Sequence, residues 1–264
     1  MDISVIIPTY KPKDYLWECL DSLVAQTFPK EKFEVILVLN GCEEPYKGQI
    51  EKYIKGHKDS LNIKLIHTLQ GGVSNARNIA LDKAEGQYIC FIDDDDYISP
   101  SYLQELYSKA SGDTIVISNT YYFKDGSSKE EYSRMAEVYS LLAPKGKTEL
   151  IKARRLFFSI WMKLIPREII RQRRFEPSLS IGEDCVFMFL ISDRIKAVDF
   201  TTADAVYYRR LRTDSALHAH NQSRRIFCND MRQIMEYTKI YLSGLRRYSF
   251  HFFLTRIRGA IHFI

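Results

Sequence analysis

The sequence predicts an α/β protein whose largely parallel central sheet is flanked by helices, with a helical extension at its carboxyl end. Short apolar runs alternate with helical patterns through the first 120 residues, and this alternation indicates βαβ units. The runs are apolar throughout, as in strands buried on both faces. With 264 residues, of which 45% are hydrophobic, the chain can bury a large core without disulfides.

The predicted elements of the first half follow one another closely. Runs that favour strands span residues 3–7, 35–39, 63–67, 88–92 and 115–117. Apolar residues recur at helical spacing over about 16–24, 46–56, 73–84 and 102–107. A nearly parallel sheet therefore accounts for this half of the chain.

The second half is less regular. Residues 120–147 are rich in Tyr, Ser, Lys, Glu and Gly with poor periodicity, which predicts an excursion such as a hairpin or a mobile lid. Helices are expected near 148–158, near 167–173 and after Gly182, with short strands at 197–200 and 205–208. The last fifty or so residues are helical, basic and aromatic.

Charge and cysteine content narrow the class of protein. The net charge is +5, but residues 1–144 hold 15 Lys/Arg against 22 Asp/Glu, and residues 145–264 hold 23 against 11. The basic half could meet nucleic acid, anionic lipid or phosphorylated substrates. Five scattered cysteines without a CxxC pair argue for a reducing compartment and against structural zinc. We also expect no secretion signal and no membrane span.

The chain is organised around an acidic run, Asp93–Asp96, that directly follows the apolar residues 88–92. These carboxylates must lie at the carboxyl end of that strand, where open α/β sheets bind ligands. Their mutual repulsion would be relieved by a hard divalent cation such as Mg²⁺ or Mn²⁺. The alternative is a solvated acidic turn that opens the next helix, capped by Asp96 or Ser99.

Polar residues also end the first two strands. Pro8, Thr9 and Tyr10 follow the first strand, where proline turns the chain outward and leaves a hydroxyl and an aromatic face suited to a flat base. Asn40, at the end of the second strand, offers a donor and an acceptor to a base edge. Each feature is equally compatible with an ordinary turn.

Residues 71–78, GGVSNARN, suggest an anion site. Two glycines before a helix let backbone N–H groups approach an anion, and the fork-shaped guanidinium of Arg77 matches phosphate. The segment is neither a GxGxxG nor a Walker sequence. A surface salt bridge is the alternative for Arg77.

Two charged groups later in the chain are further candidates. Glu183 and Asp184 open a helix, where acids are common because the helix dipole favours them. A carboxylate facing a bound diphosphate could instead remove a proton from an incoming hydroxyl. Arg209, Arg210 and Arg212 could contact a leaving phosphate or form a basic surface loop.

In this order the motifs resemble the inverting family 2 glycosyltransferases of the GT-A fold, particularly bacterial surface-polysaccharide enzymes. The resemblance covers roughly residues 1–215. The segments that carry it are VIIPTYK, a strand ending in a turn pair, GVSNARN, FIDDDD, the Trp-x-Lys-Leu stretch at 161–164, FEPSLSIGED and a late YYRR.

The resemblance implies roles for the donor side. In that family the segment similar to Pro8–Tyr10 helps to hold the nucleotide base, and the arginine matched by Arg77 lies near the diphosphate. The DxD pair matches Asp93, near the ribose and metal, and Asp95, which coordinates the metal. Asp94 then fills the variable place.

It also implies roles for the acceptor side. The family's acidic pair falls on Glu183 and Asp184, and its second acid is the usual base. Trp161 and Lys163, with Arg209 and Arg210, become candidates for contacts with the diphosphate or the acceptor.

The chain departs from the family pattern in two places. Its acidic run allows a shifted register, Asp94 with Asp96. Where relatives commonly have an Asp-Asp-Gly-Ser turn, this chain has Leu39–Cys42. The base contact would therefore come from Asn40, which leaves uracil or another base open.

We expect, from this resemblance, a metal-dependent, hexosyltransferase-like enzyme that moves a sugar from a nucleotide-diphosphate-sugar, with UDP as the first choice, to an acceptor hydroxyl. Mn²⁺ or Mg²⁺ would be its cofactor and a saccharide or lipid-linked molecule its acceptor. Residues 1–215 would form the GT-A domain, with a nucleotide-binding half, 1–119, and an acceptor half, 120–215. Residues 216–264 would be the helical extension.

Two other functions stay open. A sugar-nucleotidyltransferase would also use metal-binding acids, but should carry a glycine-rich basic loop after the first strand, where this chain has PTYKPKDY. A non-catalytic nucleotide- or nucleic-acid-binding protein could use the basic half, yet no RRM, KH or helix-turn-helix pattern is present. We therefore expect no nucleic-acid partner.

The C-terminal stretch interleaves arginines with aromatic residues, as in GLRRYSFHFFLTRIRG. This pattern is typical of an interfacial helix on anionic lipid. It fits a cytoplasmic enzyme attached peripherally to the inner face of the membrane, and equally a helix packed on the domain with solvated arginines.

Overall fold

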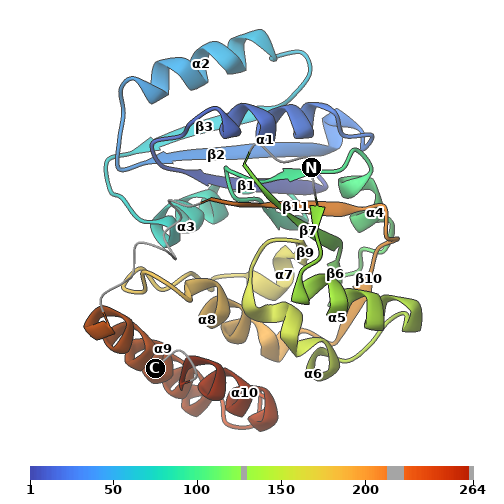
Figure 1. Cartoon of the computed structure of the whole chain (residues 1–264), viewed down its shortest axis with the longest axis vertical. Helices are drawn as coiled ribbons and strands as arrows, with labels where there is room; N and C mark the ends of the chain where they lie inside the picture. Colours follow the sequence, from blue (N-terminus) through green and yellow to red (C-terminus); the bar gives the residue numbers. More distant parts are fainter. Residues whose placement is uncertain (126–129, 213–222, 262–264) are drawn as a thin grey trace.

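A seven-stranded sheet forms the centre of the protein, which a computed structural model describes over residues 1–125, 130–212 and 223–261. The strand order is β10-β6-β9-β4-β1-β2-β3 (Figure 1). The strands are β1 (Ile3–Thr9), β2 (Phe33–Asn40), β3 (Ile63–Thr68), β4 (Tyr88–Phe91), β6 (Thr114–Ile117), β9 (Lys163–Pro166) and β10 (Ala197–Phe200).

The strands of this sheet pair in parallel except at β9, which runs antiparallel to both β4 and β6. Every residue of β1 and β2 is buried, because helices and loops cover both faces of the sheet. In the register, Ile3 of β1 lies beside Phe33 of β2 and Tyr88 of β4. The carboxyl ends of these three strands therefore open on the same edge.

A second, four-stranded sheet in the order β5-β11-β7-β8 stands beside the first. Its strands are β5 (Tyr97–Ile98), β7 (Asn119–Lys124), β8 (Glu130–Glu131) and β11 (Val206–Leu211). β11 pairs in parallel with β7 and antiparallel with β5. β5 directly follows the acidic run, so the pairing of β5 with β11 fixes the carboxyl end of that run.

The helices cover the sheets and extend the molecule. In chain order they are α1 (Tyr15–Val24), α2 (Tyr46–Gly56), α3 (Val73–Lys83), α4 (Tyr102–Ser108), α5 (Arg134–Leu142), α6 (Leu150–Ala153), α7 (Arg167–Ile170), α8 (Glu183–Leu190), α9 (Ser223–Ser243) and α10 (Phe250–Ile261). Short 3₁₀ turns are η1 (Lys30–Lys32), η2 (Ala143–Lys145), η3 (Arg154–Phe158) and η4 (Ser192–Arg194). α9 and α10 pair at the end of the molecule opposite α2 (Figure 1).

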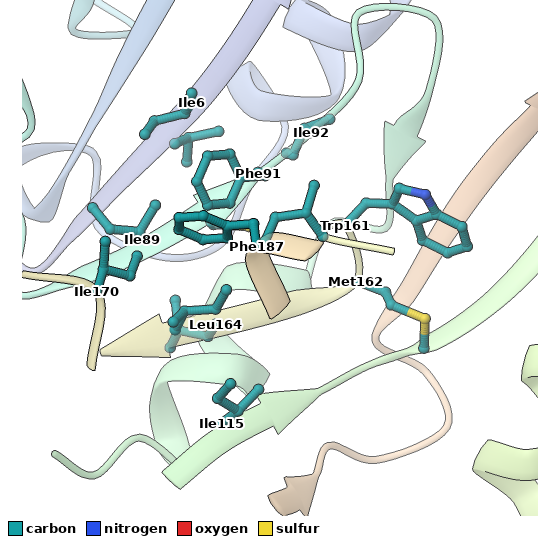
Figure 2. Packing of buried hydrophobic residues seen from close by; sticks show 14 of the residues in the cluster. Ile6, Ile89, Phe91, Ile92, Ile115, Trp161, Met162, Leu164, Ile170 and Phe187 are labelled. Atoms are coloured by element: carbon teal, nitrogen blue, oxygen red, sulfur yellow. The ribbon is translucent and has the colours of Figure 1, made fainter. Parts of the chain in front are cut away.

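The core continues from the sheet into the base of α8. Phe187 of α8 stacks on Phe175, with ring centroids 3.9 Å apart, and meets the ring of Phe91 edge-on at 6.5 Å. Figure 2 shows Phe91 and Phe187 beside Leu164 of β9 and Ile89 of β4. The start of α8 is thereby fixed against the end of β4.

The predicted α/β class, the mostly parallel sheet and the helical extension are confirmed. The expected hairpin in residues 120–147 is present as β7 and β8, followed by α5. β9 was not predicted, and β1 continues through Pro8 to Thr9 rather than ending at Ile7. The boundary predicted between residues 215 and 216 lies outside the described residues. Within the described ranges, no helix is long and apolar enough to cross a membrane.

Candidate active site

The acidic run after β4 divides into one buried carboxylate, Asp96, and three partly exposed ones. Asp96 is buried, and its carboxylate accepts hydrogen bonds from the Tyr207 hydroxyl (2.7 Å) and the Arg210 backbone N–H (2.8 Å). Asp96 thus fastens the run to β11. A register that uses Asp96 as a metal ligand suits the geometry poorly, because this carboxylate is already satisfied.

The negative charges of Asp94 and Asp95 are only partly compensated by their neighbours. Burial, with repulsion from Asp95, raises the pKa of Asp94 to about 7, although the Thr9 hydroxyl donates to its Oδ2 at 2.5 Å. Burial and the charge of Asp93 raise the pKa of Asp95 to about 6. The Arg212 guanidinium lies 3.0 Å from Asp95. A cation at this edge would relieve the remaining repulsion.

Arg77 joins the acidic run to the start of α8. Its Nη2 donates to Asp93 Oδ1 at 3.0 Å, and its Nη1 donates to Asp184 Oδ1 at 2.6 Å and to Glu183 Oε1 at 3.1 Å. The side chain is 3% exposed, and its guanidinium lies 5.4 Å from the centre of the Phe175 ring. A single arginine of α3 therefore joins Asp93 to the adjacent pair Glu183 and Asp184, which lies far from Asp93 in sequence.

Asp184 is held on both oxygens. Arg77 donates to Oδ1, and the backbone N–H of Ile160 donates to Oδ2 at 3.2 Å. Burial raises the pKa of Asp184 above its ordinary value, and the neighbouring Arg77 opposes that rise. A carboxylate with a raised pKa and a fixed orientation is suited to accept a proton.

Glu183 differs from Asp184 in its contacts. Burial, followed by repulsion from Asp184, raises the pKa of Glu183 to about 7. Its carboxylate accepts from Arg77, whereas Asp184 is bonded both to Arg77 and to the Ile160 backbone. The two acids of the pair are therefore not equivalent.

The acidic run fits a metal shared with a ligand better than a resident ion. Across residues 1–125, 130–212 and 223–261, no three or more His, Cys, Asp or Glu side chains form a group that could hold a metal. Mg²⁺ is commonly held in proteins by one or two carboxylates, completed by phosphate oxygens and water. The predicted pair Asp93 and Asp95 suits that arrangement.

Four of the predicted nucleotide-binding residues are buried: Pro8, Thr9, Asn40 and Arg77. Pro8 is buried within β1. Asn40 is 4% exposed, and its amide donates to the Thr9 carbonyl (2.7 Å) and accepts from the Gly72 N–H (3.0 Å). Asn40 ties the ends of β1 and β2 to the start of α3, so the expected contact between its side chain and a base is not supported by the structure.

Tyr10 is the exposed aromatic residue at this edge, with 52% of its surface accessible. A Cβ added to Gly41 would lie 3.3 Å from the Tyr10 ring and 3.1 Å from the backbone of Gly71. Gly41 has φ +69°. Because it lacks a side chain, the chain at Gly41 can approach both Tyr10 and Gly71 closely. The Tyr10 ring offers a flat surface for a base.

The arginines of β11 point to opposite faces of their strand. The Arg209 guanidinium lies 5.5 Å from the Trp161 ring and 5.2 Å from the Tyr122 ring. Arg210 instead donates to Asp125, to Glu18 and to the Asp95 carbonyl. The contact of Arg210 with a diphosphate stays a prediction, and it would require these bonds within the protein to break.

Trp161 and Lys163 lie deeper than predicted. Trp161 is 4% exposed and stacks on Tyr207 at 5.0 Å. Lys163 has no exposed surface, and its ammonium donates to the Trp161 carbonyl (3.1 Å) and the Ser159 hydroxyl (3.4 Å). The contact of Lys163 with a substrate stays a prediction, and it would require this buried ammonium to become accessible.

Three contributors to the site were not predicted as such: the Ile160 N–H, the Tyr207 hydroxyl and the Phe175 ring. The Ile160 N–H is a backbone group, which no side-chain pattern can reveal. Tyr207 and Phe175 lie in segments that did attract notice, YYRR and FEPSLSIGED. Their buried orientation depends on the tertiary packing.

Comparisons with known proteins are consistent with this geometry. Residues 4–174 match the family model described as Glycosyl transferase family 2. The "Uncharacterized glycosyltransferase EpsJ" of Bacillus subtilis is 31% identical over 206 residues, which cover 75% of this chain and 58% of EpsJ. The chain thus spans less than two thirds of that relative.

Solved structures share the fold. The crystal structure of Staphylococcus aureus TarS 1–349 in complex with UDP-GlcNAc matches with a TM-score of 0.76 and 22% identity, covering 100% of this chain and 72% of that one. A Pyrobaculum calidifontis mannosyltransferase in complex with GDP-Man and Mn²⁺ matches with a TM-score of 0.64 and 16% identity, covering 99% and 73%.

Proposed function

The chain belongs to glycosyl transferase family 2, and from this premise we propose that it transfers a sugar, with inversion, from a UDP-sugar to an acceptor hydroxyl in the synthesis of a bacterial surface polysaccharide. TarS, whose name is poly(ribitol-phosphate) beta-N-acetylglucosaminyltransferase, is 40% identical over 107 residues, which cover 40% of this chain and 18% of TarS. Its crystal structures with UDP-GlcNAc and with UDP support the choice of donor.

The observation that carries the proposal is the contact of one guanidinium with both Asp93 and Asp184. Arg77 bonds to Asp93 at 3.0 Å and to Asp184 at 2.6 Å. A carboxylate suited to the donor's metal and a carboxylate suited to a general base are thus held by the two Nη groups of one guanidinium. In a metal-assisted inverting transfer, the base acts on the acceptor on one face of the reacting sugar carbon, and the metal acts on the leaving group on the other.

Asp184 accepts the proton of the acceptor hydroxyl as the hydroxyl oxygen forms its bond to the anomeric carbon. The bond from that carbon to the diphosphate breaks on the opposite face, and the leaving diphosphate carries away the electron pair. When bound by Asp93 and Asp95, Mn²⁺ or Mg²⁺ would stabilise the charge on the diphosphate. Mn²⁺ in the related mannosyltransferase structure supports this cofactor.

Nucleotide binding would involve the edge formed by β1 and β2. Tyr10 would stack on the base, while Thr9 orients Asp94 through a hydrogen bond of 2.5 Å. Arg209, between Trp161 and Tyr122, is the arginine of β11 that we assign to the diphosphate or acceptor. Residues 1–119 would bind the nucleotide, and residues 120–215 the acceptor.

We further propose that the acceptor is a saccharide or is lipid-linked, and that the chain works at the inner face of the cytoplasmic membrane. The outer face of the extension, called here the α9–α10 outer face, combines exposed apolar and basic side chains. Its members are Met235, Lys239, Leu242, Leu245, Arg246, Arg247 and Phe250. This combination suits an anionic lipid surface.

The proposal is tested by incubating the chain with Mn²⁺ and each of several α-linked UDP-sugars, UDP-GlcNAc first, with water or a ribitol-phosphate polymer as acceptor. Release of UDP, together with a β-configured product in the proton NMR spectrum, is expected. An α-configured product would rule out inversion. Absence of UDP release from every UDP-sugar, with release of GDP from GDP-mannose, would rule out a UDP donor.

A further inference from the structure

Arg256 of α10 is a buried cation with no carboxylate partner among the described residues. It is 1% exposed, and its guanidinium lies between two rings, 4.0 Å from the centre of Phe158 and 4.6 Å from that of Phe252. Its Nε has no hydrogen-bond partner among the residues that the structure describes. Burying a charge costs free energy unless hydrogen bonds replace those that the charged group made to water.

Both of its Nη groups hold one segment of backbone. Nη1 donates to the Phe157 carbonyl at 3.1 Å, and Nη2 donates to the Arg154 carbonyl at 2.6 Å. These carbonyls belong to η3, inside which Phe157 departs from helical geometry. The C-terminal extension therefore adds two hydrogen bonds to an irregular turn.

The other end of this turn contacts the proposed catalytic base. Two residues beyond η3, the Ile160 N–H donates to Asp184 Oδ2 at 3.2 Å. Beside it, the Cys185 thiol donates to the Phe158 carbonyl at 3.1 Å. Residues 154–160 are thus held between α10 on one side and the start of α8 on the other.

Gly259 lets α10 approach this closely. A Cβ added at Gly259 would lie 3.2 Å from an edge carbon of the Phe158 ring, which is tighter than ordinary packing. Phe252 of α10 also meets Phe157 edge-on, with centroids 6.4 Å apart. The fit between α10 and η3 is therefore specific at several adjacent atoms.

We propose that Arg256 is a positioning residue: by holding the carbonyls of η3, it places the Ile160 N–H against Asp184 and so orients the base for the acceptor hydroxyl. This inference rests on the proposed function of Asp184. It assigns the helical extension a part in the reaction, in addition to any contact with a membrane.

Loss of the Ile160 hydrogen bond has a predictable consequence. A donor to the charged carboxylate favours that charged form, so its removal raises the pKa of Asp184 further. Because the base works when deprotonated, the acid limb of the pH–rate profile moves to higher pH. The carboxylate also loses one of its two fixed bonds, which lowers kcat while the donor-binding edge on β1 and β4 is left intact.

The test compares Arg256→Met and Arg256→Lys with Arg258→Met, which removes a charge from the exposed side of the same helix. Hydrogen exchange of the peptide 157–162 is measured in the full chain, together with the pH profile of UDP release from UDP-GlcNAc. In Arg256→Met, the amide of Ile160 should exchange faster, and kcat should fall roughly tenfold or more. The KM for the donor should stay the same, and the acid limb of the pH–rate profile should move to higher pH. Arg256→Lys should recover part of each effect, and Arg258→Met should resemble the wild type.

Unchanged exchange at Ile160 in Arg256→Met would overturn the proposal. Faster exchange with unchanged kcat and acid limb would also overturn it, because Arg256 would then be only structural. If Arg256→Met does not fold, Gly259→Ala keeps the arginine and displaces Phe158, and the same three readouts decide. Normal turnover by Asp184→Asn would refute the proposed base instead, while leaving the exchange result interpretable.

Discussion

At the scale of single residues, Arg77 determines which carboxylates act together. Its two Nη groups bond to Asp93, Glu183 and Asp184 within 3.1 Å, so little of this arginine remains for a phosphate while these bonds persist. The family resemblance implied a place near the diphosphate, and a diphosphate arriving at Asp93 would indeed lie near it. Arg77 is therefore well suited to transmit donor binding to the base.

Replacement of the proposed base should affect turnover far more than binding. Asp184→Asn keeps the shape of the side chain but cannot accept the proton, so kcat should fall by about 10² to 10⁴-fold with UDP affinity nearly unchanged. Glu183→Gln should lower kcat less. Asp113→Asn, at an exposed acid paired with Lys196, serves as the control. Normal turnover by Asp184→Asn would contradict the assignment.

The buried Lys163 should make stability depend on pH. Burial lowers the pKa of Lys163 to about 7, whereas the unfolded chain keeps a value near 10.5. Between these pH values the unfolded state binds the extra proton, so this residue's contribution to the free energy of unfolding rises with pH. Lys163→Met should raise the Tm most near pH 6, with a gain that narrows toward pH 10. A lower Tm at every pH would contradict this account.

Single-residue predictions from the sequence named groups that the structure brings into contact, but they did not give the orientation of some of them. The acidic run, Arg77 and the Glu183–Asp184 pair follow from residue type and position beside predicted elements. The inward direction of Asn40, Lys163 and Arg210 does not, because strand alternation tells which residues share a face but not which neighbour satisfies each polar group.

At the scale of elements, α8 depends on a glycine that precedes it. Gly182 has φ +80°, and a Cβ there would lie 2.4 Å from the Gln233 side chain of α9. Gly182→Ala should therefore destabilise the protein by about 1–2 kcal/mol from the left-handed backbone alone, since Gln233 can move aside. Chemical denaturation measures the free energy of unfolding, and Gly56→Ala, at a position where a Cβ meets no other atom, is the control. Equal stability of the two variants would contradict the predicted cost at Gly182.

The α9–α10 outer face gives a second prediction for an element. The double variant Leu245→Glu/Phe250→Glu should weaken binding to vesicles that contain anionic lipid by about tenfold or more, because each change removes apolar area and adds repulsion. Leu141→Glu, at an exposed leucine of α5, is the matched control. Equal sedimentation of the double variant and the wild type would show that another surface, or none, meets the membrane.

Several elements were predicted to within a few residues, as for α2 and β10. β9 was not, because Lys163–Pro166 follows no alternation and pairs antiparallel between β4 and β6. Its place depends on strands from distant parts of the sequence, and such long-range pairing leaves no local signal. The hairpin of β7 and β8 was expected only as one of two possibilities.

At the scale of the whole molecule, the two oppositely charged parts of the chain meet at the site. Arg77 and Asp93 come from the acidic first 144 residues, and Asp184 comes from the basic remainder. Arg77 lies in α3, Asp93 follows β4, and Asp184 lies at the start of α8. The sequence indicated that these groups belong to one site, but their bonding through a single guanidinium required the structure.

The most direct test of a metal-assisted nucleotide site is a thermal-shift series with UDP, dTDP, GDP, CDP and ADP, each with Mn²⁺, Mg²⁺ or EDTA. A ligand that binds the folded state alone adds about 2.7 kcal/mol at a hundred times its Kd, an increase of several degrees in Tm. We predict a metal-dependent shift with UDP that Asp95→Ala abolishes. No metal-dependent shift with any of the five nucleotides would contradict the central claim.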